Sequence, residues 1–421
     1  MANETKICNA YDLAKETYKD FGVDTDKAIE TLQKTRISLH CWQVDDIKGF
    51  EEGQAESQNV VTGNYPGAAR NADEVRQDLA YVFSLTPSGR KINIHSVYAE
   101  PKKPTSREKL DVTAFEKWID WAKENNAGID YNGSFFAHKM MDGTLSLTSP
   151  KKEVRDFWIE HLKTSRETAY NIGKKLNDVC VLNTWIPDGL KDNPADRSYW
   201  RELLIDSLDK GFAAKYDKKH LVDALEGKLF GIGTECFVAG SYDFYLAYAL
   251  KHDLGICLDS GHYHPTEQIS DKFSALKFFF TDILLHISRG VRWDSDHVVI
   301  DDDSLTSIMT EAKRAELLGS NHFHIGLDYF DASINRVYAS AVGMRAAARA
   351  MLRAILEPTD LIKAAERKGD YSERLALSEE AKALPFNAVW DMACLKAGVP
   401  VGKDWLVSVR DYTAKYIAKR G

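Results

Sequence analysis

KINIHSVY, residues 91–98, is a short apolar run, and a helical pattern over 113–125 follows it. The same alternation of an apolar run with a helical pattern is repeated along most of the chain. The runs predict eight strands, at 37–42, 91–98, 128–132, 179–186, 221–229, 254–258, 283–288 and 321–327. Buried parallel strands have this apolar composition, and helices that alternate with strands favour parallel pairing. The pattern therefore predicts an α/β fold, a (β/α)8 TIM barrel.

The main alternative is a doubly wound open sheet. That fold places a glycine-rich phosphate-binding turn directly after its first strand. Residues 43–70 follow the first predicted strand here, and they form a long polar stretch without such a turn. The barrel is therefore favoured, and the polar stretch is predicted to be a long loop.

Helical periodicity flanks the predicted barrel on both sides. Residues 1–35 are predicted to form an N-terminal helical segment that Gly22 divides into two helices. The barrel would occupy residues 36–331, and residues 332–421 would form a C-terminal helical extension. Terminal helices of this kind often make oligomer contacts, so self-association is expected.

The bulk composition is that of an ordinary globular protein. The 421 residues are 44% hydrophobic and 28% charged, with a net charge of −8 and no basic stripe, which argues against nucleic-acid partners. Residues 1–30 lack the apolar core of a signal peptide, and no run of about 18 apolar residues occurs, so no membrane association is expected. The six cysteines lack C-x-x-C spacing and are interpreted as buried free thiols in a reducing cytoplasm.

Polar residues cluster where the predicted strands end. In a (β/α)8 barrel the active site is built at the C-terminal ends of the strands. These ends carry His40, Trp42, His95, Asn132, Trp185, Asp188, Glu226, Lys228, Asp259, His262, His286, Asp294, Asp296 and Asp328. A single histidine in a strand is usually a core residue, but polar residues at nearly every strand end indicate a functional site.

Six of these residues are carboxylates, and five of them are predicted to converge on one face, namely Glu226, Asp259, Asp294, Asp296 and Asp328. Their repulsion in a partly buried site requires cations, and two divalent metals balance the charge better than one. Asp294 and Asp296, in RWDSDH (292–297), would point the same way on an extended backbone, although a solvated acidic turn is the competing interpretation. Oxygen and imidazole donors without thiolate suit Mn²⁺ or Mg²⁺, with Co²⁺ as a substitute.

Lys228 stands two residues after Glu226, so both side chains would share one face of an extended strand. A lysine beside metal-bound carboxylates could bind a substrate oxygen, and a structural ion pair is the alternative. Aromatic residues near the same strand ends could stack on a sugar or could simply pack in the core. These residues are Trp42, Phe136, Trp185, Tyr263 and Trp293.

Several motifs together identify a family. They are ISLHCWQVDDIKGFE (37–51), TGNYPG (62–67), INIHSVY (92–98), TWIPDG (184–189), EGKLFGIG (226–233), CLDSGHYHPTE (257–267), RWDSDHVV (292–299) and HIGLDYFDASINR (324–336). With these motifs the chain resembles, over nearly its full length, the L-rhamnose isomerases, metal-dependent aldose-ketose isomerases related in fold to xylose isomerase. Gly227 departs from the serine expected there, but Glu226 and Lys228 on either side of it match.

The resemblance implies a role for each matched residue. One metal would be held by Glu226, Asp259, His286 and Asp328, and a second, catalytic metal by His262, Asp294 and Asp296. Lys228, Asp294, Asp296 and His95 would be catalytic, and Lys228 would contact the O1 oxygen of the sugar. His95 and Trp185 would position the sugar, and Trp42 and Phe136, among the rings near the strand ends, are the further residues predicted to bind the substrate.

The resemblance also implies the reaction and the assembly. L-rhamnose and L-rhamnulose would be interconverted as the first step of L-rhamnose catabolism, with two Mn²⁺ ions per subunit, in a cytoplasmic homotetramer. A metal-mediated hydride shift is the favoured chemistry, and a carboxylate base with an enediol is the alternative. A mobile loop after the first strand would close over the site.

Other functions remain open at this point. A barrel isomerase or epimerase could act on another aldose with the same ligand set. A metal-dependent barrel phosphodiesterase would need basic residues for phosphate, which the acidic balance disfavours. A non-catalytic sugar-binding protein would not need Lys228 beside two metals.

Overall fold

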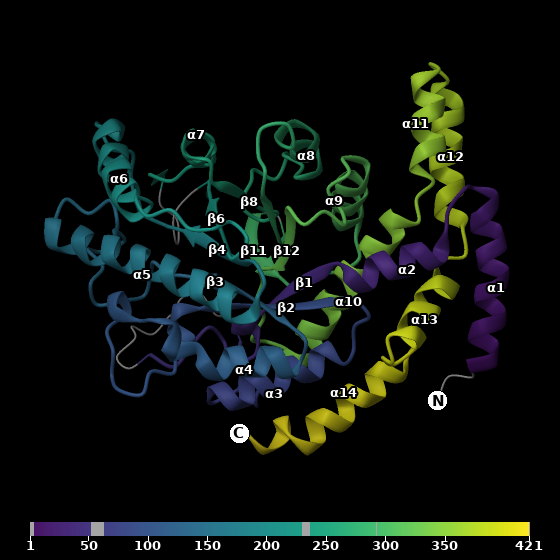
Figure 1. The fold of residues 1–421 in the computed structure, drawn as a ribbon, viewed down its shortest axis with the longest axis horizontal. Coiled ribbons are helices and arrows are strands. Elements are labelled where there is room, and N and C mark those ends of the chain that lie inside the picture. The colour runs from purple at the N-terminus through teal and green to yellow at the C-terminus, as the bar shows by residue number, and fades with distance from the viewer. Residues whose placement is uncertain (1–3, 52–62, 230–235, 292, 421) are drawn as a thin grey trace.

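Eight parallel strands close into a barrel in the computed structural model, which describes residues 4–51, 63–229, 236–291 and 293–420 (Figure 1). The strands are β1 (Arg36–His40), β2 (Gly89–His95), β3 (Gly128–Asn132), β4 (Cys180–Trp185), β6 (Leu221–Glu226), β8 (Gly255–Asp259), β9 (Ile283–Ile287) and β12 (Phe323–Leu327). Around the barrel their order is β1-β12-β9-β8-β6-β4-β3-β2. Each corresponds to one predicted strand, which confirms the (β/α)8 barrel.

Three predicted strands were too long by two or three residues at their C-terminal ends. β1 ends at His40 and β2 at His95, and the short 3-10 helices η1 (Cys41–Gln43) and η2 (Ser96–Tyr98) follow them directly. The apolar residues of these turns are buried, as strand residues are, so composition does not mark the boundary. β6 ends at Glu226, so Lys228 lies beyond the strand and the predicted shared strand face does not extend to it.

The helices of the outer ring alternate with the strands. They are α3 (Ala72–Phe83), α4 (Glu116–Glu124), α5 (Lys152–Leu176), α6 (Arg197–Gly211), α7 (Tyr242–His252), α8 (Ser270–Leu276), α9 (Asp303–Arg314) and α10 (Arg336–Ile355). Three further 3-10 turns are η3 (Arg107–Lys109), η4 (Val112–Phe115) and η5 (Ile417–Lys419). Capping side chains fix several helix starts, as at Asn71 and Asn335, which accept hydrogen bonds from backbone N–H groups of the first turn.

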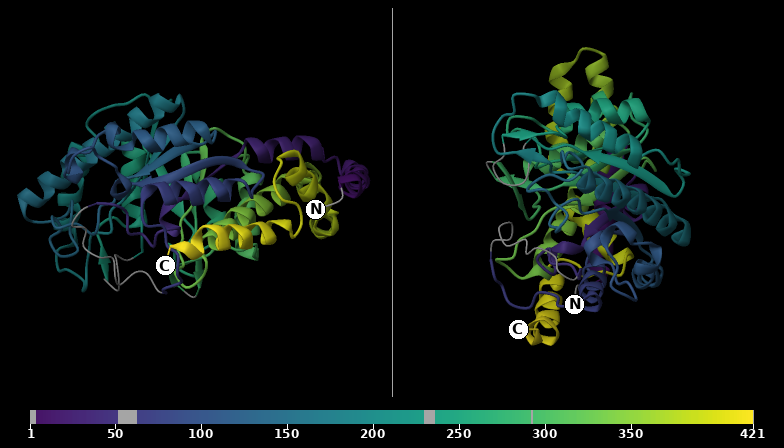
Figure 2. Two further views of the ribbon diagram at one scale, coloured as in Figure 1. Left: turned by 90° about the horizontal axis from the view of Figure 1, so that it is seen from below. Right: turned by 90° about the vertical axis from the view of Figure 1, so that its left-hand side faces the viewer.

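Most of the terminal helices lie at one end of the molecule (Figure 1). The terminal helices are α1 (Glu4–Asp20), α2 (Thr25–Lys34), α11 (Thr359–Arg367), α12 (Tyr371–Ala383), α13 (Phe386–Lys396) and α14 (Asp404–Lys415). Helix α1 packs against α13 there, whereas α14 leads the C-terminal end of the chain away to α3, where Tyr412 donates a hydrogen bond to Asp78 (Figures 1 and 2). Helix α10 packs against α9, α2 and β1. The division of the chain at residues 35 and 331 stays a prediction, because helices on both sides of it contact the barrel.

Alternation along the strands separates two apolar clusters. Outward residues such as Leu225, Leu258 and Leu285 join the main core beneath the helices. Inward residues form a separate cluster of Val181, Val222, Ala224, Cys257 and Leu284 inside the barrel. Successive strand residues point to opposite faces, so two residues farther along each strand the inward side chain is Asn183, Glu226, Asp259 or His286. An apolar cluster from β4, β6, β8 and β9 thus lies below a polar layer at the C-terminal strand ends, whereas β2 and β3 contribute the buried ion pair of Lys91 and Asp130.

Two small antiparallel sheets lie outside the barrel. The strands β10 (Arg289–Val291) and β11 (Trp293–His297) form a hairpin that begins two residues after β9 ends. The strands β5 (Gly189–Leu190) and β7 (Phe237–Val238) pair with each other. The hairpin carries the predicted Asp294 and Asp296 pair, so these residues are on an added strand.

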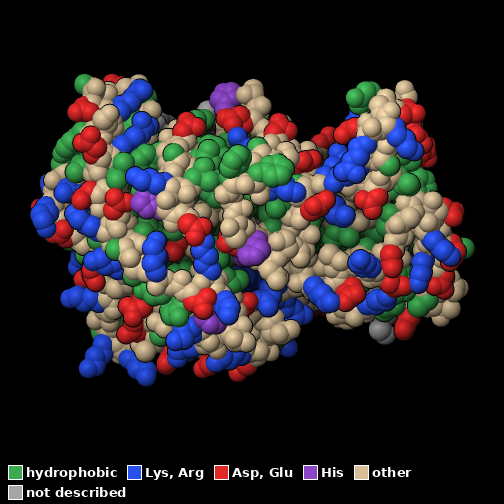
Figure 3. Space-filling view, turned by 45° about the horizontal axis from the view of Figure 1, so that its top comes forward, with side chains coloured by type: hydrophobic (Ala, Val, Ile, Leu, Met, Phe, Trp, Pro, Cys, Tyr) green, Lys and Arg blue, Asp and Glu red, His purple; other side chains and the backbone are tan. Residues whose placement is uncertain are grey.

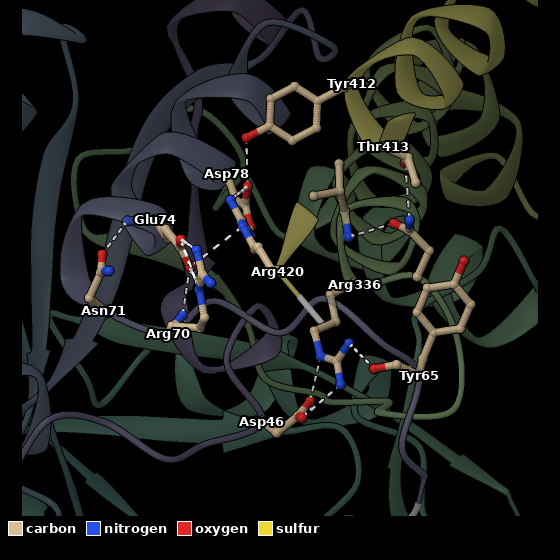
Figure 4. A network of polar contacts seen from close by, with 12 residues as sticks. Asp46, Tyr65, Arg70, Asn71, Glu74, Asp78, Arg336, Tyr412, Thr413 and Arg420 are labelled. Carbon is tan, nitrogen blue, oxygen red and sulfur yellow. Dashed lines mark hydrogen bonds and ion pairs between the residues drawn. The ribbon is translucent and has the colours of Figure 1, made fainter. Parts of the chain in front are cut away.

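The long loop after β1 is tied to the C-terminal half of the chain at both of its described ends (Figure 4). Arg336 donates hydrogen bonds of 2.6 and 2.7 Å to the two carboxylate oxygens of Asp46. The same side chain donates at 2.6 Å to the backbone carbonyl of Tyr65. The predicted mobile part of this loop includes residues 52–62, which lie outside the described residues.

The cysteines and the helices test two further expectations. All six cysteines are free, as predicted, but only four are buried: Cys8 is half-buried and Cys236 is exposed. Within the described ranges, no helix combines the length and the apolar run that would be needed to cross a membrane.

Candidate functional site

Four side chains from four neighbouring strands meet at the C-terminal end of the barrel. They are Glu226 at the end of β6, Asp259 at the end of β8, His286 in β9 and Asp328 directly after β12. One potential ligand atom from each lies within 4.8 Å of the others. Nδ1 of His286 lies 3.2 Å from Oε2 of Glu226 and 3.1 Å from Oδ2 of Asp328. We call these four residues the ligand cluster.

Asp259 is oriented by its neighbours so that one oxygen faces the cluster. Its Oδ1 accepts hydrogen bonds from the backbone N–H of Gly261 at 2.7 Å and from the hydroxyl of Ser288 at 2.9 Å. Its Oδ2 is buried and accepts no hydrogen bond from any described group. A buried carboxylate oxygen without a donor is costly unless a cation satisfies it. Asp259 is therefore set as a cation ligand.

The electrostatics of the cluster indicate a shortage of positive charge. Burial lowers the pKa of His286, but Cys257, Glu226 and Asp328 together raise that pKa well above its usual value. Burial raises the pKa of Glu226, but His262 and His286 beside it bring that pKa well below its usual range. Glu226 thus draws protons onto His262 and His286, whereas burial and the neighbouring carboxylates Asp328 and Glu226 raise the pKa of Asp259 to about 7. A bound cation would take over the role of these protons.

The chemistry of the donors fits a divalent cation. Three carboxylates and one imidazole form an oxygen-rich set of the kind that Mn²⁺ or Mg²⁺ accepts. Glycine at position 326 leaves room for the imidazole, because a Cβ there would lie 3.1 Å from Cδ2 of His286. The cluster contains the four residues that the sequence assigned to the first metal.

The residues predicted for a second metal are placed only in part. His262 lies beside the cluster, with Nδ1 2.9 Å from Oε1 of Glu226. Asp296 has φ 45°, in the left-handed region. Its backbone is therefore not extended, whereas the prediction that Asp294 and Asp296 point the same way required an extended backbone. Asp294 belongs to β11, and its side chain lies outside the described residues. The second metal site stays a prediction.

A row of rings leads away from the ligand cluster. The ring of Trp185 lies 6.2 Å from that of His262, and the ring of Phe136 lies 5.5 Å from that of Trp185. His95 continues the row at 5.9 Å from Phe136, and Trp42 completes it at 4.5 Å from His95. We call Trp42, His95, Phe136 and Trp185 the aromatic row.

Lys228 lies beyond the end of β6 but contacts the aromatic row. Its Nζ is 5.3 Å from the centre of the Trp185 ring, a cation–π contact. The structure thus brings together the five side chains that the sequence assigned to substrate binding. The buried indole Nε1 of Trp185 has no hydrogen-bond partner among the described residues, so it can serve as a donor to a ligand.

His95 is held in one orientation at the centre of the row. Its Nδ1 lies 2.8 Å from the hydroxyl oxygen of Ser134. Burial lowers the pKa of His95 to about 3, so the imidazole is neutral near pH 7. A neutral ring has one donor and one acceptor nitrogen, and the contact with Ser134 selects between them.

Sequence reasoning missed several residues that complete the site. Asn183 donates a hydrogen bond to Glu226, and the thiol of Cys257 lies 3.6 Å from the same carboxylate. Both stand two residues before a recognised strand-end residue, so strict alternation along the strands could have found them. Gly261 follows Asp259 at the spacing of an Asx turn, which is also visible in sequence. Ser134 and Ser288 leave no such signal.

Asp188, one of the polar residues at the predicted strand ends, has a structural role. Both carboxylate oxygens of Asp188 accept hydrogen bonds, from Ser146 and from Thr148, at 2.6–2.8 Å. These bonds tie the loop after β3 to the end of β4. Asp188 therefore supports the fold, and its position at a strand end does not make it part of the ligand cluster.

Known proteins match this chain over nearly its whole length. The family model described as "L-rhamnose isomerase (RhaA)" matches residues 5–420. The L-rhamnose isomerase of Listeria monocytogenes serotype 4a (strain HCC23) is 47% identical over 422 residues, which cover 100% of both chains. Those of Rhodopirellula baltica and Salmonella paratyphi B are 47% and 45% identical, over 98% and 99% of this chain and 97% and 99% of theirs. The chain therefore belongs to the L-rhamnose isomerase family.

Proposed function

We propose that the chain is an aldose-ketose isomerase that interconverts L-rhamnose and L-rhamnulose, the first step of L-rhamnose catabolism. One observation carries the proposal: the ligand cluster adjoins the aromatic row, and Lys228 lies over that row at Trp185. A cation site would hold the oxygens of a sugar, and rings would stack on its apolar faces. Membership of the family supports the same substrate.

The family implies a divalent metal, and we propose two Mn²⁺ ions per subunit, with Mg²⁺ or Co²⁺ as substitutes. Glu226, Asp259, His286 and Asp328 would hold the first, which the unsatisfied oxygen of Asp259 supports. His262, Asp294 and Asp296 would hold the second. When bound, such a metal polarises the substrate oxygens and stabilises negative charge on them.

The side chains of the row would bind and orient the sugar. The ammonium of Lys228 would donate a hydrogen bond to O1 and stabilise charge that develops there. His95, neutral and fixed by Ser134, would contact a hydroxyl with its other ring nitrogen. Trp42 and Phe136 flank His95 and would keep water away from that side.

In the proposed reaction, the hydrogen on C2 moves to C1 as a hydride while O2 loses a proton and O1 gains one. The aldehyde at C1 becomes an alcohol, and C2 becomes the ketone carbon. Asp294, Asp296, His95 and Lys228 are the proposed groups that manage the protons on O1 and O2. Running the reaction in heavy water tests this route, because deuterium at C1 or C2 in every turnover would require an enediol instead.

A single substitution tests the proposed role of Asp296. Asp296→Asn keeps the size of the side chain and removes its charge, so turnover of L-rhamnose should fall far more than the stability of the protein. Initial rates and the denaturation midpoint measure the two effects. Equal losses in both would mean that Asp296 is structural.

We also propose a cytoplasmic homotetramer. Large apolar side chains are exposed in several places, with Leu13, Phe278 and Phe279 each more than 70% accessible. Helix α12 buries none of its residues, and apolar side chains gather over the middle of the α6–α9 side (Figure 3). Extended exposed apolar surface is typical of protein interfaces. Light scattering would measure the mass in solution, and a monomer mass would contradict the proposal.

The six free cysteines support a reducing compartment.

A further inference from the structure

Arg107 is a fully buried cation behind the aromatic row. It begins the 3-10 helix η3, and its side chain has no solvent exposure. Its Nε donates to Oε1 of Glu51 at 3.1 Å, and its Nη2 donates to Oε2 of the same residue. Its Nη1 donates to the backbone carbonyls of Ser134 at 2.5 Å and Phe136 at 2.8 Å. A buried charge persists only with such a set of partners.

The two carbonyls belong to the turn that carries the middle of the row. In this turn, residues 133–137, Ser134 has φ 56° and Ala137 has φ 50°, a region that residues other than glycine rarely adopt. Ser134 contacts His95, and Phe136 contacts both His95 and Trp185. A strained turn keeps its shape when surrounding contacts hold it, and Arg107 supplies two of them.

A second side chain supports the same turn from behind. His161 of α5 lies with Nδ1 3.1 Å from the carbonyl oxygen of Arg107 and with Nε2 against the carbonyl oxygen of Gly133. Burial lowers the pKa of His161 to about 3, so its neutral ring donates a hydrogen bond to only one of these two carbonyls and packs against the other. Both η3 and the start of the turn therefore contact α5. Arg107 is thus itself held while it holds residues 133–137.

The carboxylate partner of Arg107 belongs to the segment that follows Trp42. In that segment, Asp45 accepts hydrogen bonds from Tyr98 at 2.6 Å and from the N–H of Gly49 at 2.9 Å. The backbone N–H of Phe50 donates to the carbonyl of Val97 at 2.7 Å. Residues 42–51 are therefore anchored near the end of β2, and Glu51 joins them through Arg107 to the turn at 133–137.

We propose that Arg107 is a positioning residue that fixes Phe136 and the segment after Trp42 beside His95 and so determines substrate affinity. The inference rests on the proposed function, since the row is the proposed substrate wall. The fork of the guanidinium matches one carboxylate and two carbonyls together, which a single ammonium cannot do. Arg107→Lys therefore keeps the charge and loses the geometry.

Arg166 provides a matched control at a distance from the row. It is also buried, with 3% exposure of its side chain, and its Nε and Nη2 donate to the two oxygens of Asp223 at 3.0 and 2.9 Å. Its Nη1 donates to the carbonyls of Gly211 and Ala214 at 3.1 and 2.9 Å. Arg166→Lys therefore removes an equivalent fork without touching residues 133–137 or Glu51.

The experiment compares Arg107→Lys, Arg166→Lys and the unmodified full chain, each loaded with Mn²⁺. Both variants should lose similar stability in urea unfolding. Arg107→Lys should raise KM for L-rhamnose about tenfold or more, with a smaller change in kcat, while Arg166→Lys should leave KM within about twofold. The Mn²⁺ affinity should stay within about twofold in both, because neither arginine contacts the ligand cluster.

Two further measurements keep the result decisive. If Arg107→Lys does not fold, Glu51→Gln replaces it, and it should also raise KM. The ¹⁵N shifts of the His95 imidazole in metal-free protein should change in the Arg107 or Glu51 variant and stay unchanged in Arg166→Lys. Unchanged KM and unchanged His95 shifts would overturn the positioning role. An unmodified chain that does not convert L-rhamnose would overturn the proposed function instead, and the imidazole shifts would still decide the role of Arg107.

Discussion

The hydroxyl of Ser288 holds the carboxylate of Asp259 with one oxygen toward the ligand cluster. Residues that orient a metal ligand in this way typically change metal affinity by about 10–100-fold when they are removed. Ser288→Ala should therefore weaken Mn²⁺ binding by about that factor. Isothermal titration with Mn²⁺ measures the change.

Ser207 offers the control for this variant. It is a buried serine that donates at 2.7 Å to the carbonyl of Leu147, far along the chain from the cluster. Ser207→Ala should cost about 1 kcal/mol of stability, as the loss of one hydrogen bond does, and leave Mn²⁺ affinity unchanged. Equal Mn²⁺ affinities in both variants would show that Ser288 does not orient Asp259.

Asp45 should make stability depend on pH. Burial raises the pKa of its carboxyl to about 7, although Tyr98 and Gly49 donate hydrogen bonds that favour the charged form. In the unfolded chain the pKa is about 3.9. Between these values the folded state holds a proton that the unfolded state releases, so the free energy of unfolding falls as pH rises from about 4 to about 7.

Asp45→Asn removes this titration. The difference in the free energy of unfolding between Asp45→Asn and the unmodified chain should grow from pH 4.5 to pH 7.5 and then level, reaching on the order of a few kcal/mol. Urea unfolding at several pH values measures it, and buried histidines that titrate in both proteins cancel in the difference. A difference that is constant with pH would mean that Asp45 is already ionised in the folded state.

Among single residues, the candidate metal ligands were predicted from the sequence more completely than the residues that orient them. Glu226, Asp259 and His286 stand at strand ends, where the barrel geometry directs them together. The serines that orient the site come from turns, and a serine in a turn has no spacing that distinguishes a structural hydroxyl from an orienting one. Arg107 was missed for the same reason, since only the fold brings it against Glu51 and the turn after β3.

At the scale of elements, the C-terminal segment fastens helix α3. Arg420 donates to both carboxylate oxygens of Asp78, at 2.5 and 2.8 Å, and the hydroxyl of Tyr412 donates to Asp78 at 2.5 Å (Figure 4). The rings of Tyr412 and Tyr81 stack at 3.8 Å. The last described residues therefore close the ring of helices on the side where α3 begins the βα repeats.

Asp78→Asn should destabilise the protein strongly. The side chains of Arg420 and Asp78 are each 2% exposed, and removal of one partner leaves a buried charge, at a cost of about 3–5 kcal/mol. The control is Asp301→Asn, which breaks an exposed pair with Arg353 at 3.1 Å and should cost about 0–1 kcal/mol. Denaturant unfolding compares them, and equal losses would contradict the buried role of the Arg420–Asp78 pair.

Element boundaries show where sequence patterns stop being informative. The helical pattern at 113–125 corresponds to η4 and α4, which together cover residues 112–124, because its apolar residues recur at helical spacing. The predicted C-terminal ends of the strands were less accurate, because η1 and η2 bury apolar residues that follow no regular spacing in the sequence. The β10–β11 hairpin was not predicted, and its left-handed Asp296 explains why a spacing rule for extended strands fails there.

At the scale of the whole molecule, the closed barrel follows from the order of its elements. Eight apolar runs that alternate with helices leave few topologies, and the observed strand order follows the chain around the barrel. The polar layer over the apolar cluster of β4, β6, β8 and β9 also follows from alternation, once the strands are placed. The tetramer and the second metal do not follow, because they depend on partners and side chains that the fold alone does not position.

Ketose formation from L-rhamnose by the purified protein tests metal-dependent isomerisation most directly. Treatment with a chelator should abolish conversion, and added Mn²⁺ should restore it, because the ligand cluster cannot hold the oxygens of the sugar without a cation. Stable, folded protein must be verified in the metal-free sample by circular dichroism. Full conversion of L-rhamnose by the metal-free protein, or no conversion with Mn²⁺ bound, would contradict metal-dependent isomerisation of L-rhamnose by this protein.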